Sequence, residues 1–181
     1  MKTKLFSIAA ALSFLLFLSA APAFAQFPTT CSNALLQGNY GFTVDGKIIP
    51  PGGSAFVAQQ GVALQHFDGE GHFTAVDFIM TNGTPAINAS TAVNGNGFRS
   101  NENGTYTVNP DCTGSMTLNQ DTKFLTLAST IQIKFVLVKG GKEIREVVTS
   151  VTAFPLGVKT NIPATILANG KKLGPLSGEM D

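Results

Sequence analysis

The chain has 181 residues and a formal net charge of +1, and only 13% of its residues are charged. This balance gives no electrostatic reason to expect nucleic acid or an anionic membrane surface as a partner. The length suits a single domain with a sizeable hydrophobic core.

The first 25 residues have the three regions of a secretory signal peptide. Lys2 and Lys4 give the charged start, an apolar stretch follows, and Ala23 and Ala25 are the small residues that a signal peptidase requires. Cleavage after Ala25 would leave ten basic residues against eleven acidic ones, a net charge of −1. The sequence therefore predicts a secreted or periplasmic protein with no membrane anchor once the signal peptide is removed.

Alternating patterns begin soon after this leader. Residues 39–46, "NYGFTVDG", place aromatic and aliphatic residues at every second position, which is typical of a half-buried strand. Residues 54–67 and 72–81 are two further strand-like stretches, and together they enclose the octet "HFDGEGHF". Residues 82–104 are rich in Asn, Gly, Ser and Thr, which fits either an exposed loop or ragged edge strands.

Two more hairpins are predicted in the second half of the chain. Residues 104–109 and 115–120 flank the turn "PDCTG", and residues 131–138 and 143–151 flank the turn "KGGK". From about residue 155 onward Gly and Pro interrupt the pattern, and we expect an irregular C-terminal tail.

No stretch has a helical period over twelve residues or more, so the sequence predicts an all-β protein. Several short strands joined by tight turns favour one antiparallel domain over residues 26–181. We expect a single up-and-down barrel of about eight strands, because closure removes exposed strand edges. A β-sandwich is the alternative.

The two cysteines, Cys31 and Cys112, belong to a chain predicted to be exported, where disulfides persist. We expect them to pair and to close a long loop. Two free thiols with a redox or metal-binding role are the alternative, but the chain has no C-x-x-C spacing.

The octet "HFDGEGHF" combines histidines and carboxylates, which are common metal ligands. A calcium loop starting at Asp68 would have the wrong residues at its fifth and twelfth positions. Zinc needs three or four ligands, and His66 and His72 fall on opposite faces of the predicted hairpin. Gly69 and Gly71 permit the positive φ angles of a tight turn, so we interpret the octet as a structural turn and predict no metal and no cofactor.

A two-residue turn inside the octet would pair Phe67 with His72. In that register Asp77 shares a largely apolar face with Gln60 and His66, which makes these three residues candidate ligand contacts. A carboxylate on such a face is unusual, because burial disfavours its charged form.

The C-terminal hairpin repeats this feature. A type I′ turn at Gly140 and Gly141 pairs Phe135 with Glu146, which places Glu146 on an apolar face. Inside a barrel such a carboxylate needs a partner or a raised pKa, so Asp77 and Glu146 are the candidate functional residues. The alternative is that both lie at the barrel rim, or that a bulge changes the register.

Three motifs resemble a group of small secreted bacterial proteins. They are a C-x-x-x-L-x-G-x-Y-G-F opening, an F-D-G-x-G turn and a G-x-Y-x-V-x-x-D-C-x-G stretch, which begin here at Cys31, Phe67 and Gly104. The resemblance extends to about Val151. It implies a small exported protein with a barrel like those of the calycins or of allene oxide cyclase, and it carries over no activity and no catalytic residue.

The motifs of common enzyme classes are missing from the sequence: there is no G-x-S-x-G elbow, H-E-x-x-H, P-loop or dinucleotide fingerprint. The sequence favours a non-catalytic function, either binding of a small apolar or amphipathic ligand in the barrel or an extracytoplasmic interaction module. The alternatives are an enzyme of the cyclase or isomerase type that uses Asp77 and Glu146, and a purely structural surface protein. A cavity lined by these carboxylates would distinguish the hypotheses.

Overall fold

A computed structural model describes residues 30–86, 96–120, 127–155 and 158–174. The predicted signal peptide lies outside the described residues. Within them the chain forms one short 3-10 helix, η1, and ten strands. Their bounds are η1 Asn33–Leu36, β1 Gln37–Ile48, β2 Val57–Asp68, β3 His72–Thr81, β4 Thr84–Pro85, β5 Arg99–Val108, β6 Thr113–Gln120, β7 Leu127–Val138, β8 Glu143–Pro155, β9 Thr160–Ile162 and β10 Ala164–Lys172.

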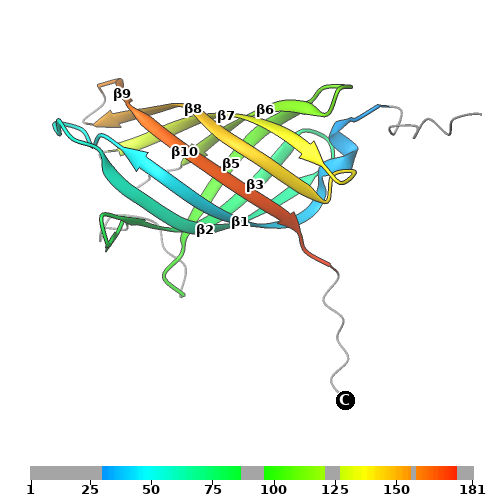
Figure 1. Ribbon diagram of the computed structural model, residues 1–181, viewed down its shortest axis with the longest axis horizontal. Helices are drawn as coiled ribbons and strands as arrows, with labels where there is room; N and C mark the ends of the chain where they lie inside the picture. The colour runs from blue at the N-terminus through cyan, green and yellow to red at the C-terminus, as the bar shows by residue number, and fades with distance from the viewer. Residues whose placement is uncertain (1–29, 87–95, 121–126, 156–157, 175–181) are drawn as a thin grey trace, which may run out of the picture.

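Eight of the strands close into a barrel, and Figure 1 shows them inclined across its wall. They follow the order β1, β2, β3, β5, β6, β7, β8 and β10, and β10 pairs with both β1 and β8 to complete the circle. All of these pairings are antiparallel. The short strands β4 and β9 lie outside this circle, on β3 and β8. The predicted antiparallel barrel of about eight strands is therefore confirmed, and the sandwich alternative is wrong.

The prediction of an irregular tail from about residue 155 is wrong, because β10 is the strand that closes the barrel. Its inward-facing positions include Ile166, Ala168 and Gly170, all of them buried. Two of these residues are small, so the hydrophobic alternation is weak in the sequence. Small residues suit this strand because Gly170 is paired with Phe42, whose ring occupies the space that a Cβ would need.

Large inward side chains on one strand face glycines on the next. Three such pairs are Phe42 with Gly170, Phe73 with Gly104, and Phe135 with Gly114. A Cβ added at Gly104 would lie 2.5 Å from Cε1 of Phe73. Glycine in a strand interior normally weakens a sheet, but here each one makes room for an aromatic ring. The pairing of Gly and Phe therefore sets the packing of the barrel interior.

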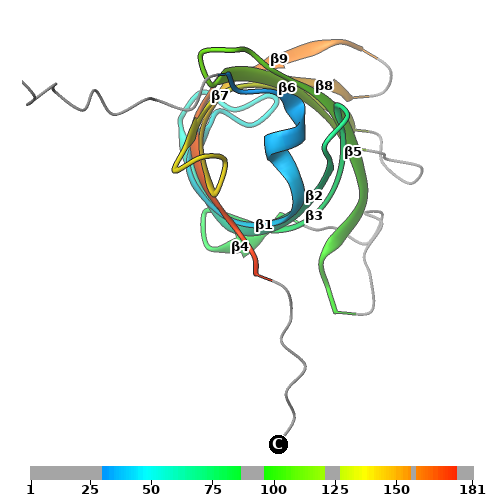
Figure 2. The same ribbon diagram turned by 90° about the vertical axis from the view of Figure 1, so that its right-hand side faces the viewer.

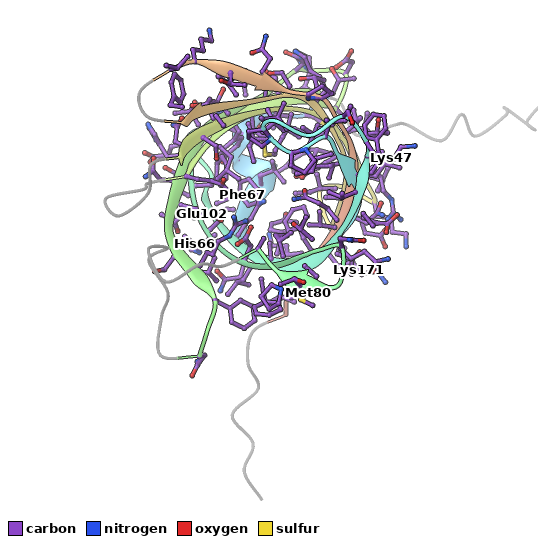
Figure 3. All side chains as sticks on the ribbon, turned by 90° about the vertical axis from the view of Figure 1, so that its left-hand side faces the viewer. Lys47, His66, Phe67, Met80, Glu102 and Lys171 are labelled. Carbon is purple, nitrogen blue, oxygen red and sulfur yellow. A yellow bond between two sulfur atoms is a disulfide. The ribbon has the colours of Figure 1, made fainter. Side chains whose placement is uncertain are left out.

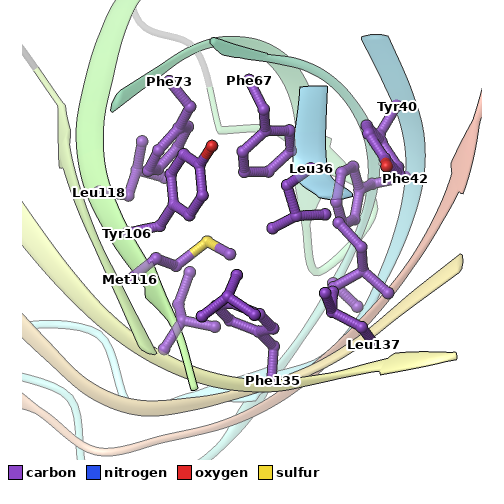
Figure 4. Close-up of a cluster of buried hydrophobic side chains, with 14 of the residues drawn as sticks. Leu36, Tyr40, Phe42, Phe67, Phe73, Tyr106, Met116, Leu118, Phe135 and Leu137 are labelled. Carbon is purple, nitrogen blue, oxygen red and sulfur yellow. The ribbon is translucent and has the colours of Figure 1, made fainter. Parts of the chain in front are cut away.

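One end of the barrel is filled and closed. Figure 2, a view along the barrel from this end, shows η1 lying across the lumen. Leu36 of η1 is completely buried, at the centre of a ring of aromatic side chains that Figure 4 shows in close-up. The hydroxyl of Tyr40 donates a hydrogen bond to the carbonyl of Gly141 at 2.5 Å, which ties this end to the β7–β8 hairpin.

The predicted disulfide is confirmed. Cys31, just before η1, is bonded to Cys112 in the turn between β5 and β6, with 5.0 Å between the Cα atoms. The amide of Cys31 also donates to the carbonyl of Pro110 at 3.2 Å. The bond therefore fixes the segment that closes the barrel to the hairpin beside it.

The octet is a hairpin turn, but its predicted register is wrong by one residue. Phe67 pairs with Phe73, so the connection is longer than a two-residue turn. One carboxylate oxygen of Asp68 accepts hydrogen bonds from the amides of Glu70, Gly71 and His72 at 2.7, 2.9 and 3.0 Å. These bonds stabilise a wider loop in which Gly71 has a φ of 125°.

The C-terminal hairpin has the predicted register. Phe135 pairs with Glu146, and Leu137 with Ile144. Gly140 and Gly141 both have positive φ angles, of 64° and 82°, as the central residues of a type I′ turn require.

Candidate ligand-binding site

The half of the barrel away from η1 holds a cavity of about 270 Å³. Its wall is largely aliphatic, with Ile79, Ile131 and Ile166 among the lining residues. Alanines such as Ala75 and Ala153 stand at inward positions here, whereas aromatic rings occupy the corresponding positions near η1. A cavity of about 150 Å³ lined by apolar side chains is large enough to admit benzene, so this one can hold a small organic molecule.

A chain of polar side chains crosses one side of this cavity, from β3 to β7. Asp77 is buried and receives two hydrogen bonds from Arg99, one of them from Nε at 2.5 Å. A carboxylate oxygen of Glu102 lies 3.9 Å from the guanidinium of Arg99 and accepts a hydrogen bond from the amide of Gln120 at 2.8 Å. The hydroxyl of Ser129 donates to Gln120 in turn.

Arg99 owes its inward position to an irregularity between β3 and β5. Ala75 pairs with Glu102 and Asp77 with Arg99, so β5 has one residue more than β3 between these two pairs. Simple alternation would place Arg99 and Glu102 on opposite faces, but both line the cavity. A bulge of this kind re-aims a side chain, and here it completes the ion pair. Figure 3 shows Glu102 pointing into the lumen, whereas Lys47 and Lys171 lie outside it.

Glu146 stands on β8, which lies opposite β3 in the circular strand order. Its side chain is buried, its Oε1 atom has no hydrogen-bond partner, and it lines the cavity. The paired residues on the neighbouring strands are Phe135 and Ala168, which offer no polar side chain. Burial raises the pKa of Glu146 to about 8.

Glu102 is the second carboxyl group in the cavity with a raised pKa. Burial contributes most to the rise, the charge of Asp77 adds to it, and Arg99 and Gln120 oppose it, with a resulting pKa of about 8. At neutral pH the cavity therefore holds one Asp77–Arg99 ion pair and two carboxyl groups that are mostly protonated.

Comparison with known proteins assigns no family to this barrel. No family model, curated protein or solved structure matches the chain.

The structure brings only two of the four predicted site residues together. Asp77 and Glu146 both face the barrel interior, and neither lies in solvent at the rim. Gln60 and His66 are exposed: Gln60 donates to Asp45 at 3.2 Å, and Nδ1 of His66 lies 2.8 Å from the side-chain oxygen of Asn39. The face that they were predicted to share with Asp77 does not form, because the wider turn at the octet shifts β3 by one residue against β2.

The octet itself contributes no side chain to the cavity lining. His72 is exposed, with its Nδ1 atom 3.2 Å from a carboxylate oxygen of Asp68. Within the described ranges no three His, Cys, Asp or Glu side chains are arranged to hold a metal ion.

Proposed function

We propose that this protein binds a small amphipathic molecule in the barrel cavity. The observation that supports the proposal most directly is a largely aliphatic cavity into which a buried and unpartnered carboxyl group, that of Glu146, projects. A buried carboxyl group destabilises the fold unless it has a hydrogen-bond or charge partner. If the barrel served only as a packed core, a hydrophobic residue at this position would be more stable. Its position at the cavity wall suits contact with the polar end of a ligand.

The aliphatic wall supplies the driving force for binding. Removing about 200 Å² of ligand surface from water contributes roughly 5 kcal/mol. Association entropy opposes this gain, so the apolar contribution alone supports weak binding. The carboxyl groups would add orientation and selectivity. The cavity favours this hypothesis over a purely structural role, which a barrel filled by side chains would fit better.

We also propose that the protein works outside the cytoplasm, after cleavage of a signal peptide behind Ala25. The disulfide between Cys31 and Cys112 supports this location, because disulfides persist in oxidising compartments and are rare in the cytosol. N-terminal sequencing of the exported protein should begin at Gln26.

An enzyme of the cyclase or isomerase type is the second candidate. Glu102 and Glu146 both line the cavity and both have a pKa raised to about 8. A pKa near the working pH suits a general acid or base, and raised values of this kind gather at catalytic sites. The same carboxyl groups can instead orient a bound molecule. We place ligand binding before catalysis, because binding requires only the cavity and its carboxyl groups and no additional catalytic residue.

Mass spectrometry of small molecules extracted from the purified protein tests the binding proposal. We expect an enriched amphipathic compound from the unmodified protein and a clear loss of it from Ala153→Phe, which puts a ring into the cavity. Val147→Phe is the matched control, because Val147 lies on the same strand but is exposed on the outer face. Equal recovery from all three proteins, or no bound compound in any of them, would contradict the proposal.

A further inference from the structure

Two buried side-chain atoms in the described part of the chain lack a hydrogen-bond partner, and both are oxygens. They are Oε1 of Gln65 and Oε1 of Glu146, and both residues line the cavity. Leaving a buried acceptor without a hydrogen bond destabilises the fold, because the atom loses its bonds to water and gains none in return. Both oxygens are free to accept a hydrogen bond from a donor on a bound molecule.

The charges around the cavity point in the same direction. Among the described residues that line it, three are acidic, Asp77, Glu102 and Glu146, and a single one, Arg99, is basic. Arg99 binds Asp77 and is near Glu102, and no ion pair within the described residues reaches Glu146. The neighbouring strands offer Glu146 only apolar partners, and no residue in the described part of the chain supplies a cation to it.

We propose that the ligand is a small organic cation, an amine with an apolar tail, whose ammonium group pairs with Glu146 while the tail lies against the aliphatic wall. This inference rests on the proposed binding function and specifies the ligand class. An ammonium group offers three donors and a positive charge, whereas an alcohol offers one donor and no charge. A carboxylate ligand would oppose the ionisation of Glu146, whereas an ammonium group would compensate the charge of its ionised form.

The pairing predicts a link between binding and pH. Burial raises the pKa of Glu146 to about 8, and an alkylamine has a pKa near 10, as lysine does. Formation of the pair at pH 7 therefore releases a proton from Glu146. If only the ionised form binds the amine, affinity rises about 50-fold between pH 6 and pH 8.

Other charged and polar groups that face the cavity could also contribute to the pH dependence of binding. On the far side Asp77 is held by Arg99, and Glu102 is held by Gln120 with Arg99 nearby; Gln65 carries no charge. Glu102 shares the raised pKa, so the Glu146→Gln variant is needed to assign the released proton.

Isothermal titration calorimetry of the full chain with octylamine, 1-octanol and octanoate tests the inference. At pH 8 we expect octylamine to bind about tenfold more tightly than 1-octanol, because a charge-assisted hydrogen bond to Glu146 is stronger than one from a neutral hydroxyl. Octanoate should bind least tightly. Titration at pH 7 in buffers of different ionisation enthalpy should show close to one proton released for each octylamine bound.

Glu146→Gln should abolish both the preference for octylamine and the proton release, while 1-octanol still binds. Asp45→Asn is the matched control, because it removes the same charge from the outer face of β1, where Asp45 is exposed. Equal affinities for octylamine and 1-octanol, or a preference that survives in Glu146→Gln, would overturn the cationic ligand and leave the binding function standing. Failure of all three probes to bind would overturn the binding function as well.

Discussion

Replacement of Glu146 by Gln should stabilise the protein at neutral pH, and by an amount that depends on pH. Burial raises the pKa of this carboxyl from 4.5 to about 8 in the folded protein. Between these two values the folded state binds more protons than the unfolded state, so the stability of the unmodified protein falls as pH rises. Below pH 4.5 both states are protonated and the penalty is gone.

The magnitude follows from the same two values. A pH of 7 is about 2.5 units above the pKa of this carboxyl in the unfolded state, where it is therefore ionised. In the folded state the carboxyl is still mostly protonated. Each pH unit is worth about 1.4 kcal/mol, so Glu146 costs the fold about 3 kcal/mol at pH 7. Glutamine keeps the shape and the polar end of the side chain without a charge, so Glu146→Gln should recover most of that amount.

Urea unfolding of both proteins between pH 4 and pH 9, with the disulfide intact, measures this difference. We expect it to be near zero at pH 4, about 3 kcal/mol at pH 7, and to level off above pH 8. Glu70→Gln is a suitable control, since Glu70 is exposed at the β2–β3 turn and its loss changes the net charge equally. If the difference in unfolding free energy between the unmodified protein and Glu146→Gln does not change from pH 4.5 to pH 8, the conclusion that Glu146 is buried without a partner would be refuted.

Three further predictions concern the frame around the cavity. Asp77→Asn should lower the unfolding free energy by about 3 kcal/mol, because it leaves Arg99 without its partner; it should also lower the pKa of Glu102, as carbon-13 NMR can measure. Unchanged stability would contradict the ion pair. Replacing Cys31 and Cys112 by Ser should lower the unfolding free energy by up to about 4.5 kcal/mol, because the disulfide closes a loop with a sequence separation of 81 and so limits the entropy of the unfolded chain. An unfolding midpoint equal to that of the unmodified protein would contradict this prediction. Gly104→Ala should cost about 1 to 3 kcal/mol in the same urea assay, because the added Cβ meets the backbone carbonyl oxygen of Thr117 and the ring of Phe73. A neutral result would show that the barrel interior is loosely packed.

Local patterns in the sequence were sufficient to predict much of the barrel. The alternation in β1 and the turn "KGGK" between β7 and β8 depend on neighbouring residues alone, and here the predicted pairing of Phe135 with Glu146 is correct. This register is also why the inward direction of Glu146 could be predicted. The disulfide was predictable because only two cysteines are present.

The polar side of the cavity depends on features that the sequence pattern does not contain. Arg99 points inward only because a bulge in β5 breaks the alternation. The polar composition of its segment predicts a loop or a ragged edge and gives no sign of an inward side chain. The register at the octet changes because Asp68 accepts three amide hydrogen bonds, a choice between turn lengths that the glycines alone do not decide. The closing strand β10 has a weak sequence pattern, because its inward positions include the small residues Ala168 and Gly170. The small size of Gly170 is explained only by the ring of Phe42 on the paired strand.

The most direct test of a ligand-binding cavity is a methyl NMR titration of the isotope-labelled protein with 1-octanol. The methyl groups of Ile79, Ile131 and Ile166, which line the cavity, should shift together and saturate with a single dissociation constant. Ile144 is the internal reference, because it is fully buried in the core beside η1 and does not line the cavity. Shifts confined to the cavity isoleucines are the predicted result. No saturable shift, or equal shifts at Ile144 and at the cavity residues, would contradict a ligand site inside the barrel.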